Sequence, residues 1–220
     1  MPTALIVGAS RGLGRAIAEE HVKRGWQVIA TVRQEGALAA GDGLTVERLD
    51  VTDLEGIDAL KQRLANHALD LLFVVAGVVG PSNVPIGEAD PEAFADMMLV
   101  NVLGPLRIAD RLADLVVDTG TVAVMSSGLG SIEGNATGGF EAYRTSKAAL
   151  GQGLRSIAAR RGDGRTYLAC DPGWVRTDMG GPQAPLSIEQ SIPKLVDTLE
   201  ARAGAGGSAF VSYDGRDLPW

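Results

Sequence analysis

The stretch that decides the fold is residues 4–14, Ala-Leu-Ile-Val-Gly-Ala-Ser-Arg-Gly-Leu-Gly. It opens with an apolar run typical of a buried strand, and glycines stand at positions 8, 12 and 14, directly before a helical stretch. Glycine there permits a tight turn and lets the backbone approach a pyrophosphate, which the N–H groups and positive dipole end of the helix can bind. The spacing differs from the commoner Gly-x-Gly-x-x-Gly fingerprint. Taken alone, the motif also fits a glycine-rich turn without a ligand.

The same order of strand and helix repeats along the chain. Short apolar runs alternate with longer stretches of helical period, the pattern of β-α-β units around a parallel sheet buried on both faces. We therefore predict a single domain over residues 1–220, with an α/β doubly wound fold and a parallel seven-stranded sheet. The predicted strands are 4–7, 27–32, 45–49, 71–75, 121–125, 166–170 and 209–212, and the predicted helices are 12–24, 54–66, 91–117, 141–161 and 187–203.

Two loops rich in glycine and proline follow predicted strands, at residues 78–87 and 180–186. In an open α/β sheet, ligands bind in the crevice beyond the carboxyl ends of the strands. We therefore expect these loops to form walls of the ligand pocket.

Composition and charge argue against several classes of protein. The formal net charge is −7, which repels phosphate backbones and anionic lipid headgroups, so we expect neither nucleic acid nor a membrane as a partner. The apolar runs are too short to span a bilayer, and no secretory signal is recognisable, so the expected location is cytoplasmic. The lone Cys170 and the isolated His21 and His67 cannot build a disulfide or a His-rich metal site. Both histidines are interpreted as surface or helix-end residues.

The end of the third predicted strand carries an acidic residue. Asp50 follows strand 45–49, where a carboxylate can accept a hydrogen bond from the amino group of an adenine. The next residues allow a second interpretation, in which Thr52 or Asp53 is the N-cap of the following helix. Asp50 is therefore a candidate adenine contact.

The end of the second predicted strand bears on the choice between NADP and NAD. NAD-binding folds place an acidic residue there for the ribose hydroxyls, but this chain has Val32 followed by Arg33. Arg33 and Arg11 could together clamp a 2′-phosphate, which favours NADP. Glu35 is the alternative ribose acceptor if the strand ends later than predicted.

Tyr143 and Lys147 lie four residues apart in the predicted helix 141–161, on one face of that helix. A phenol with a pKa near 10 is a poor acid-base catalyst at neutral pH, and a nearby cation lowers that pKa by about 1–3 units. We therefore expect Lys147 to lower the pKa of Tyr143. In carbonyl reduction, Tyr143 would donate its proton to the developing alkoxide.

Further polar residues could complete this site. Ser126 and Ser127 follow strand 121–125, where one or both hydroxyls can bond a carbonyl oxygen, although each also fits a simple strand-end residue. Asn101 is unfavourable inside the predicted helix 91–117 and could bond a water beside Lys147; the alternative is a solvated side chain.

Together these residues resemble the short-chain dehydrogenase/reductase family across essentially the whole chain. The resemblance implies a Rossmann fold, an NADP-dependent oxidoreductase and the catalytic set Asn101, Ser127, Tyr143 and Lys147. Together with Arg33, the cofactor-binding set is then Gly8, Ser10, Arg11, Gly12, Leu13, Gly14, Asp50, Val51, Ala76, Gly77, Tyr143, Lys147, Pro172, Gly173, Val175 and Thr177. The segments 125–135, 142–150, 172–181 and 214–220 are similar to the C-factor and sniffer-type carbonyl reductase branch.

The chain departs from the family pattern at three places. Residues 74–77 read Val-Val-Ala-Gly where the family usually has Asn-Asn-Ala-Gly, which removes side-chain hydrogen bonds near the adenosine ribose. Val7 replaces a threonine at the head of the glycine-rich loop. Ser127 precedes Tyr143 by more residues than is usual, so the choice of Ser127 over Ser126 rests on matching residues 127–130 to the family's Ser-x-x-Gly.

The function expected from these residues is reduction of a small or medium apolar ketone or aldehyde. Apolar side chains flank the expected pocket, although each of them also fits core or lid packing: Leu129, Phe140, Trp174 and Met179. The resemblance also allows a homodimer through the helices that begin near Pro91 and Glu141. The alternative function is a dinucleotide-binding signalling protein, similar to the C-factor, in which turnover is incidental.

Overall fold

Residues 1–81 and 84–220 are described by the computed structural model, and within them seven strands form one parallel sheet, ordered β3-β2-β1-β4-β5-β6-β7. This order confirms the predicted doubly wound α/β fold. The strands are β1 (Thr3–Val7), β2 (Gln27–Val32), β3 (Leu44–Arg48), β4 (Leu69–Val74), β5 (Val116–Met125), β6 (Thr166–Asp171) and β7 (Gly207–Ser212).

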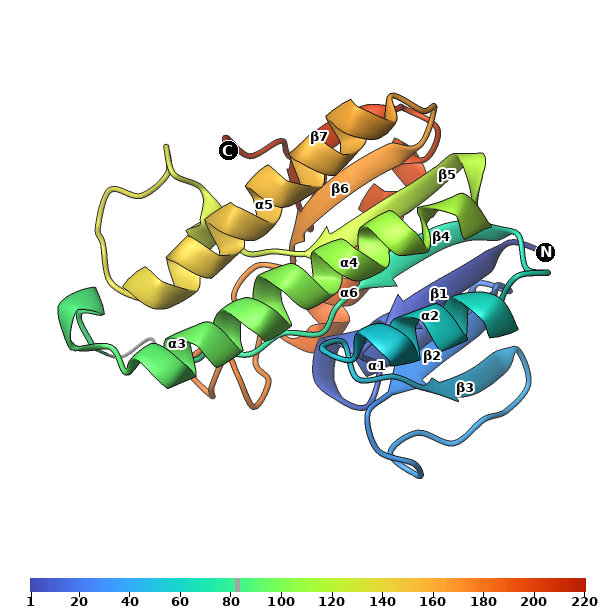
Figure 1. The fold of residues 1–220 in the computed structure, drawn as a ribbon, viewed down its shortest axis with the longest axis horizontal. Coiled ribbons are helices and arrows are strands. Elements are labelled where there is room, and N and C mark those ends of the chain that lie inside the picture. Colours follow the sequence, from blue (N-terminus) through green and yellow to red (C-terminus); the bar gives the residue numbers. More distant parts are fainter. Residues whose placement is uncertain (82–83) are drawn as a thin grey trace.

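Helices cover both faces of the sheet, as Figure 1 shows. They are α1 (Gly12–Lys23), α2 (Leu54–Arg63), α3 (Pro91–Met98), α4 (Gly104–Arg111), α5 (Glu141–Arg161) and α6 (Ile188–Arg202). In that view α2, α4 and α5 lie in front of the sheet, and α1 and α6 lie behind it. Successive strand residues point to opposite faces, so Leu5 packs into the front core and Ile6 into the rear core.

Local signals in the sequence set several helix ends. The Asp90 side chain accepts a hydrogen bond from the Ala93 N–H at the start of α3. Pro91 suits the first position of this helix, because an N–H there would have no partner within the helix. Ser187 and Gln190 form a capping box at the start of α6. At its C-terminal end, α5 stops at Gly162, whose φ of 56° is left-handed.

The predicted helix 91–117 is wrong in its middle and at its end. A π-helical turn, Leu99–Leu103, separates α3 from α4, and residues 116–117 already belong to β5. The π-helical turn precedes Pro105, which has no N–H and whose ring would clash with the preceding turn of a regular α-helix. The extra residue in the wider π-helical turn relieves this clash. At the other end, the β-branched Val116 and Val117 favour a strand, and Val116 pairs in register with Leu69.

His21 also differs from its sequence-based interpretation. It lies in the last turn of α1, but it is fully buried, whereas His67 is exposed. Its Nδ1 lies 2.8 Å from the carbonyl oxygen of Ile17, and its ring packs edge-on against Trp26. Burial lowers the pKa of His21, so this is a neutral core histidine.

Among the residues that the structure describes, no helix is both long and apolar enough to cross a membrane.

Candidate active site

A pocket of about 830 Å³ lies at the carboxyl edge of the sheet, around the ends of β1 and β4. Chain order reverses between these two strands, and such a switch point is where open α/β sheets bind ligands. Every residue of the predicted cofactor-binding set lines this pocket. The volume lies in the usual range for sites of small molecules and cofactors.

The glycine-rich loop approaches the neighbouring backbone closely. Gly8 has a φ of 93°, and a Cβ there would lie 2.8 Å from the backbone nitrogen of Ala76. A Cβ at Gly14 would lie 2.1 Å from the carbonyl oxygen of Gly8. Only glycine therefore fits either position without a shift of the backbone.

The first turn of α1 is well suited to an anion. Arg11 is the N-cap, and within the described part of the chain no side chain caps this helix and no acidic residue stands in its first turn. The free N–H groups and the positive end of the dipole therefore face the pocket that Gly12 and Leu13 help to line. This arrangement fits the pyrophosphate of a dinucleotide.

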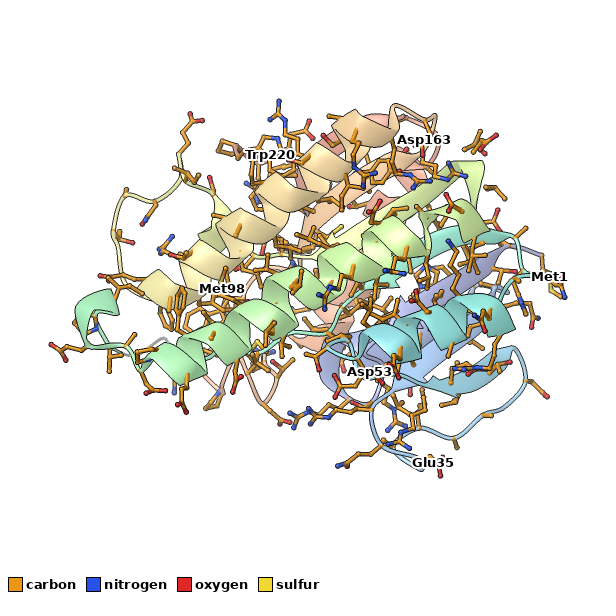
Figure 2. All side chains as sticks on the ribbon, viewed as in Figure 1. Met1, Glu35, Asp53, Met98, Asp163 and Trp220 are labelled. Carbon is orange, nitrogen blue, oxygen red and sulfur yellow. The ribbon has the colours of Figure 1, made fainter. Side chains whose placement is uncertain are left out.

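The structure separates the candidate phosphate-binding and ribose-binding residues. β2 ends at Val32, and Arg33 directly after it lines the pocket. Glu35 is exposed and lies farther along the same loop, at the outer edge of the molecule in Figure 2, away from the pocket lining. Arg11 also lines the pocket, but its guanidinium pairs with Asp178 across the mouth at 2.9 Å.

Asp50 lines the pocket beside Arg33. Its Oδ1 accepts hydrogen bonds from the N–H of Thr52 at 2.9 Å and from the Thr52 hydroxyl at 2.8 Å. These bonds, aided by the charge of Arg33, hold the pKa of Asp50 below its usual value. Asp53 takes the N-cap position of α2. Asp50 is thus an ionised hydrogen-bond acceptor at this end of the pocket.

Tyr143 and Lys147 meet at the other end of the pocket. The Lys147 ammonium is buried, donates to the carbonyl oxygen of Met125 at 2.8 Å, and lies 5.6 Å from the centre of the Tyr143 ring. Burial lowers the pKa of Lys147 to about 8. The Ser127 side chain acts on the Tyr143 hydroxyl and lowers its pKa.

The shift in the pKa of Tyr143 runs against the sequence-based expectation. Burial, together with the negative charge of Asp171, raises the pKa of Tyr143 to about 12, and the hydrogen bond to Ser127 only partly opposes this. The expected lowering of this pKa is therefore wrong, because desolvation of the phenolate is the largest effect.

Ser126 and Ser127 have different surroundings. Both line the pocket, but Ser127 accepts from the Leu129 N–H at 3.2 Å, and its side chain lowers the pKa of Tyr143. Ser126 is almost fully buried, and its backbone N–H donates to the carbonyl oxygen of Cys170. The geometry therefore favours Ser127 as the partner of Tyr143.

Asn101 lies behind the pocket and is fully buried, so its interpretation as a solvated side chain is wrong. It sits in the π-helical turn, where its Oδ1 accepts from the Val78 N–H and its Nδ2 donates to the Val78 carbonyl, both at 2.8 Å. Nδ2 also donates to the Ser146 hydroxyl at 3.1 Å. A Cβ on Gly77 would lie within 3.5 Å of both Asn101 Oδ1 and Lys147 Nζ, so Asn101 is a close neighbour of the Tyr-Lys pair.

The predicted pocket walls are only partly as expected. Val78 and Val79 of loop 78–87 line the pocket, and residues 82–83 of that loop lie outside the described residues. From loop 180–186, Gly180 lines the pocket.

Sequence reasoning missed Asp171, which ends β6 and lines the pocket. Its carboxylate accepts from the backbone N–H of Gly173 at 3.1 Å and lies close to Gly128, between the turn after Ser127 and the Pro172–Gly173 turn. Burial raises the pKa of Asp171. Its place directly before Pro-Gly at a strand end was the signal that could have identified it.

Comparisons with known proteins identify the family of this chain. The family model for short chain dehydrogenase matches residues 2–185. The chain belongs to the short-chain dehydrogenase/reductase family. Members of this family are oxidoreductases, and the chain is therefore assigned to that class.

Similar proteins include solved structures. A putative short-chain dehydrogenase/reductase from Burkholderia multivorans with bound NADP is 47% identical, with a TM-score of 0.96, over 100% of this chain and 99% of that one. A carbonyl reductase from Pseudomonas aeruginosa PAO1 in complex with NADP is 37% identical, with a TM-score of 0.92, over 100% of both chains. The C-signal of Myxococcus xanthus is 34% identical over 74% of this chain and 99% of its own length. These matches confirm the resemblance to the C-factor and carbonyl reductase branch.

Proposed function

We propose that this short-chain dehydrogenase/reductase is an NADP-dependent reductase of small or medium apolar ketones and aldehydes. The observation that carries the proposal is the position of Tyr143, whose ring centre lies 5.6 Å from the buried Lys147 ammonium and which shares its pocket with Ser127 and the uncapped start of α1. A proton donor and a dinucleotide site therefore share one cavity.

The chain's own residues then handle the proton, while the bound cofactor supplies the hydride. Tyr143 donates its proton to the oxygen that becomes the alcohol, and Ser127 stabilises the developing charge on that oxygen by a hydrogen bond. With a pKa of about 12, the Tyr143 phenol is protonated at neutral pH and can act as the proton donor. Lys147 holds a positive charge next to the phenol. Asn101 fixes the loop after β4 beside this pair.

Support for NADP over NAD comes from the residues after β2. Arg33 lines the pocket, whereas Glu35 lies away from it, so the adenosine ribose end carries a cation where an NAD site needs an acid. The two solved neighbours described above contain NADP. Arg33 is therefore the proposed contact of the 2′-phosphate.

The proposed substrate class follows from the other end of the pocket. The side chains that line it there beyond Tyr143 are mostly apolar: Val78, Val79, Leu129, Phe140, Trp174 and Met179. Such a wall favours an apolar substituent on the carbonyl carbon and offers little to an anionic one.

The test is turnover by the purified wild-type protein. Consumption of NADPH is followed by absorbance across a panel of carbonyl compounds, and NADPH binding is titrated by fluorescence. We expect turnover of apolar ketones or aldehydes together with NADPH binding. Tight NADPH binding without turnover of any compound would instead support a signalling role, which the similarity to the C-signal suggests.

A further inference from the structure

Phe140 has an unusual backbone conformation. It is the N-cap of α5, with φ 50° and ψ 35°, and among the described residues it alone has a positive φ without being glycine. Gly138 and Gly139 before it are also left-handed, with φ of 66° and 68°. The left-handed conformation is sterically unfavourable for a residue with a bulky side chain but not for glycine. Such strain persists only where the surrounding structure imposes it.

Arg144 imposes this conformation. Its guanidinium donates to the carbonyl oxygens of Gly139 at 2.9 Å, Gly138 at 3.1 Å and Leu129 at 3.5 Å. Its backbone N–H donates to the carbonyl oxygen of Phe140 at 2.8 Å. Charge-assisted bonds from one side chain therefore hold the backbone of Gly138 and Gly139, directly before Phe140, in a fixed position. Because Arg144 follows Tyr143 on α5, that position is tied to the proposed proton donor.

The Phe140 side chain belongs to an apolar wall of the pocket, which Leu129, Trp174 and Met179 complete. Phe140 is 49% exposed, Trp174 57% and Met179 50%. Trp174 is fixed by a hydrogen bond from its Nε1 to the carbonyl oxygen of Gly180 at 2.8 Å. The wall therefore presents two aromatic rings and a flexible thioether to the pocket, surfaces that pack well against a flat apolar group.

We propose that Phe140 is a specificity-determining residue that favours ketones and aldehydes with an aryl or similarly flat apolar group, and that Arg144 is the positioning residue that holds it in place. This inference rests on the proposed reductase function and names the substrate class of the same site. It explains why a strained phenylalanine stands where glycine would fit without strain.

The first experiment measures a selectivity ratio, kcat/KM for acetophenone divided by kcat/KM for butanone, with NADPH. We expect the wild type to prefer acetophenone. Phe140→Ala should lower the ratio about five- to tenfold, because the ring contact is lost. Phe140→Tyr keeps the ring and should stay within about twofold of the wild type. An unchanged ratio in Phe140→Ala, or a wild type that prefers butanone, would overturn the inference while leaving the reductase function intact.

The second experiment tests the positioning role by a double-mutant cycle. Arg144→Ala should lower the same ratio, and this effect should disappear in the Phe140→Ala background, because Arg144 acts through the ring. Arg155→Ala is the matched control on α5; it contacts Trp220 instead and should leave the ratio unchanged. A purely structural role of Arg144 would reduce both activities equally and persist in the double variant, which would contradict the proposal.

A third measurement addresses the strain without using activity. Phe140→Gly and Phe140→Ala both lack the ring, but only glycine accepts the left-handed conformation without cost. The glycine variant should unfold at a Tm about 2–4 °C higher than the alanine variant. Equal or reversed Tm values would refute the strain. If the wild type reduces other compounds of the carbonyl panel but neither ketone, this inference alone is wrong; if it reduces no compound of the panel, the proposed function is wrong as well.

Discussion

The two ends of the pocket are built in different ways. At the cofactor end, backbone packs directly against backbone, as where Gly8 meets Ala76 at the ends of β1 and β4. At the substrate end, exposed segments are held by single side chains, such as Arg144 on residues 138–139 and Trp174 on Gly180. An atom added at the cofactor end would clash with backbone, whereas the substrate end can change its shape when one side chain is replaced.

We expect the largest effect when one glycine in each region is replaced by alanine and the free energies of unfolding are compared. Gly8→Ala adds a Cβ 2.8 Å from the Ala76 nitrogen at a φ of 93°. We expect it to lower the free energy of unfolding by about 3 kcal/mol or more, from overpacking plus backbone strain, and to weaken NADPH binding. Gly138→Ala meets no atom within 4 Å and should cost only about 1–2 kcal/mol. Urea denaturation measures both, and equal losses would remove the distinction.

The next effect concerns the charge at the cofactor end. Arg33→Asp removes the proposed contact to the 2′-phosphate, and a charge-assisted hydrogen bond contributes about 1.5–3 kcal/mol. The ratio of kcat/KM for NADPH to that for NADH should therefore fall about 10–100-fold. Steady-state kinetics with both cofactors checks this. Glu35→Gln is the control and should change the ratio little; if it changes the ratio more than Arg33→Asp does, Glu35 is the ribose contact instead.

Asn101 lies beside the Tyr143–Lys147 pair, where it links Val78 after β4 to Ser146 on α5. Asn101→Ala leaves the N–H and C=O of Val78 without these partners, and we expect a loss of about 1–3 kcal/mol in the free energy of unfolding. Asn135→Ala is the matched control in the exposed segment, where Asn135 accepts from the Gly138 N–H; it should stay within about 0.5 kcal/mol. If Asn101→Ala and Asn135→Ala lose similar free energies of unfolding in chemical denaturation, the hydrogen bonds of Asn101 have no special structural role.

The smallest effect is expected at the ion pair across the mouth of the pocket. The side chains of Arg11 and Asp178 are 80% and 79% exposed, and exposed pairs contribute little. Asp178→Asn releases Arg11, so the Kd of NADPH should fall by no more than about twofold, and less at high salt. Fluorescence titration at two ionic strengths checks this. A several-fold rise in Kd would show that the pair closes over the cofactor.

The same contrast explains what could be predicted from the sequence. Local sequence patterns correctly predicted the ends of β2 and α5 and the position of Arg33 in the pocket. These predictions succeeded because parallel strands and a glycine-rich turn have few alternative arrangements. Other features could not be predicted because they depend on tertiary packing or on backbone geometry. These are the burial of His21, the π-helical turn at Asn101 and the hydrogen bonds from Arg144 to residues 138–139. The raised pKa of Tyr143 was missed because it comes from burial and from the charge of Asp171, which depend on the folded structure.

The most direct test of the account compares the wild type with Tyr143→Phe, which removes only the proposed proton donor and keeps the ring. Loss of a positioned general acid typically costs about 10²–10⁴-fold in rate. Reduction of the best carbonyl substrate should therefore fall by at least about two decades in kcat/KM, while the Kd of NADPH changes less than several-fold. Full activity in Tyr143→Phe would contradict the reductase mechanism proposed for this site.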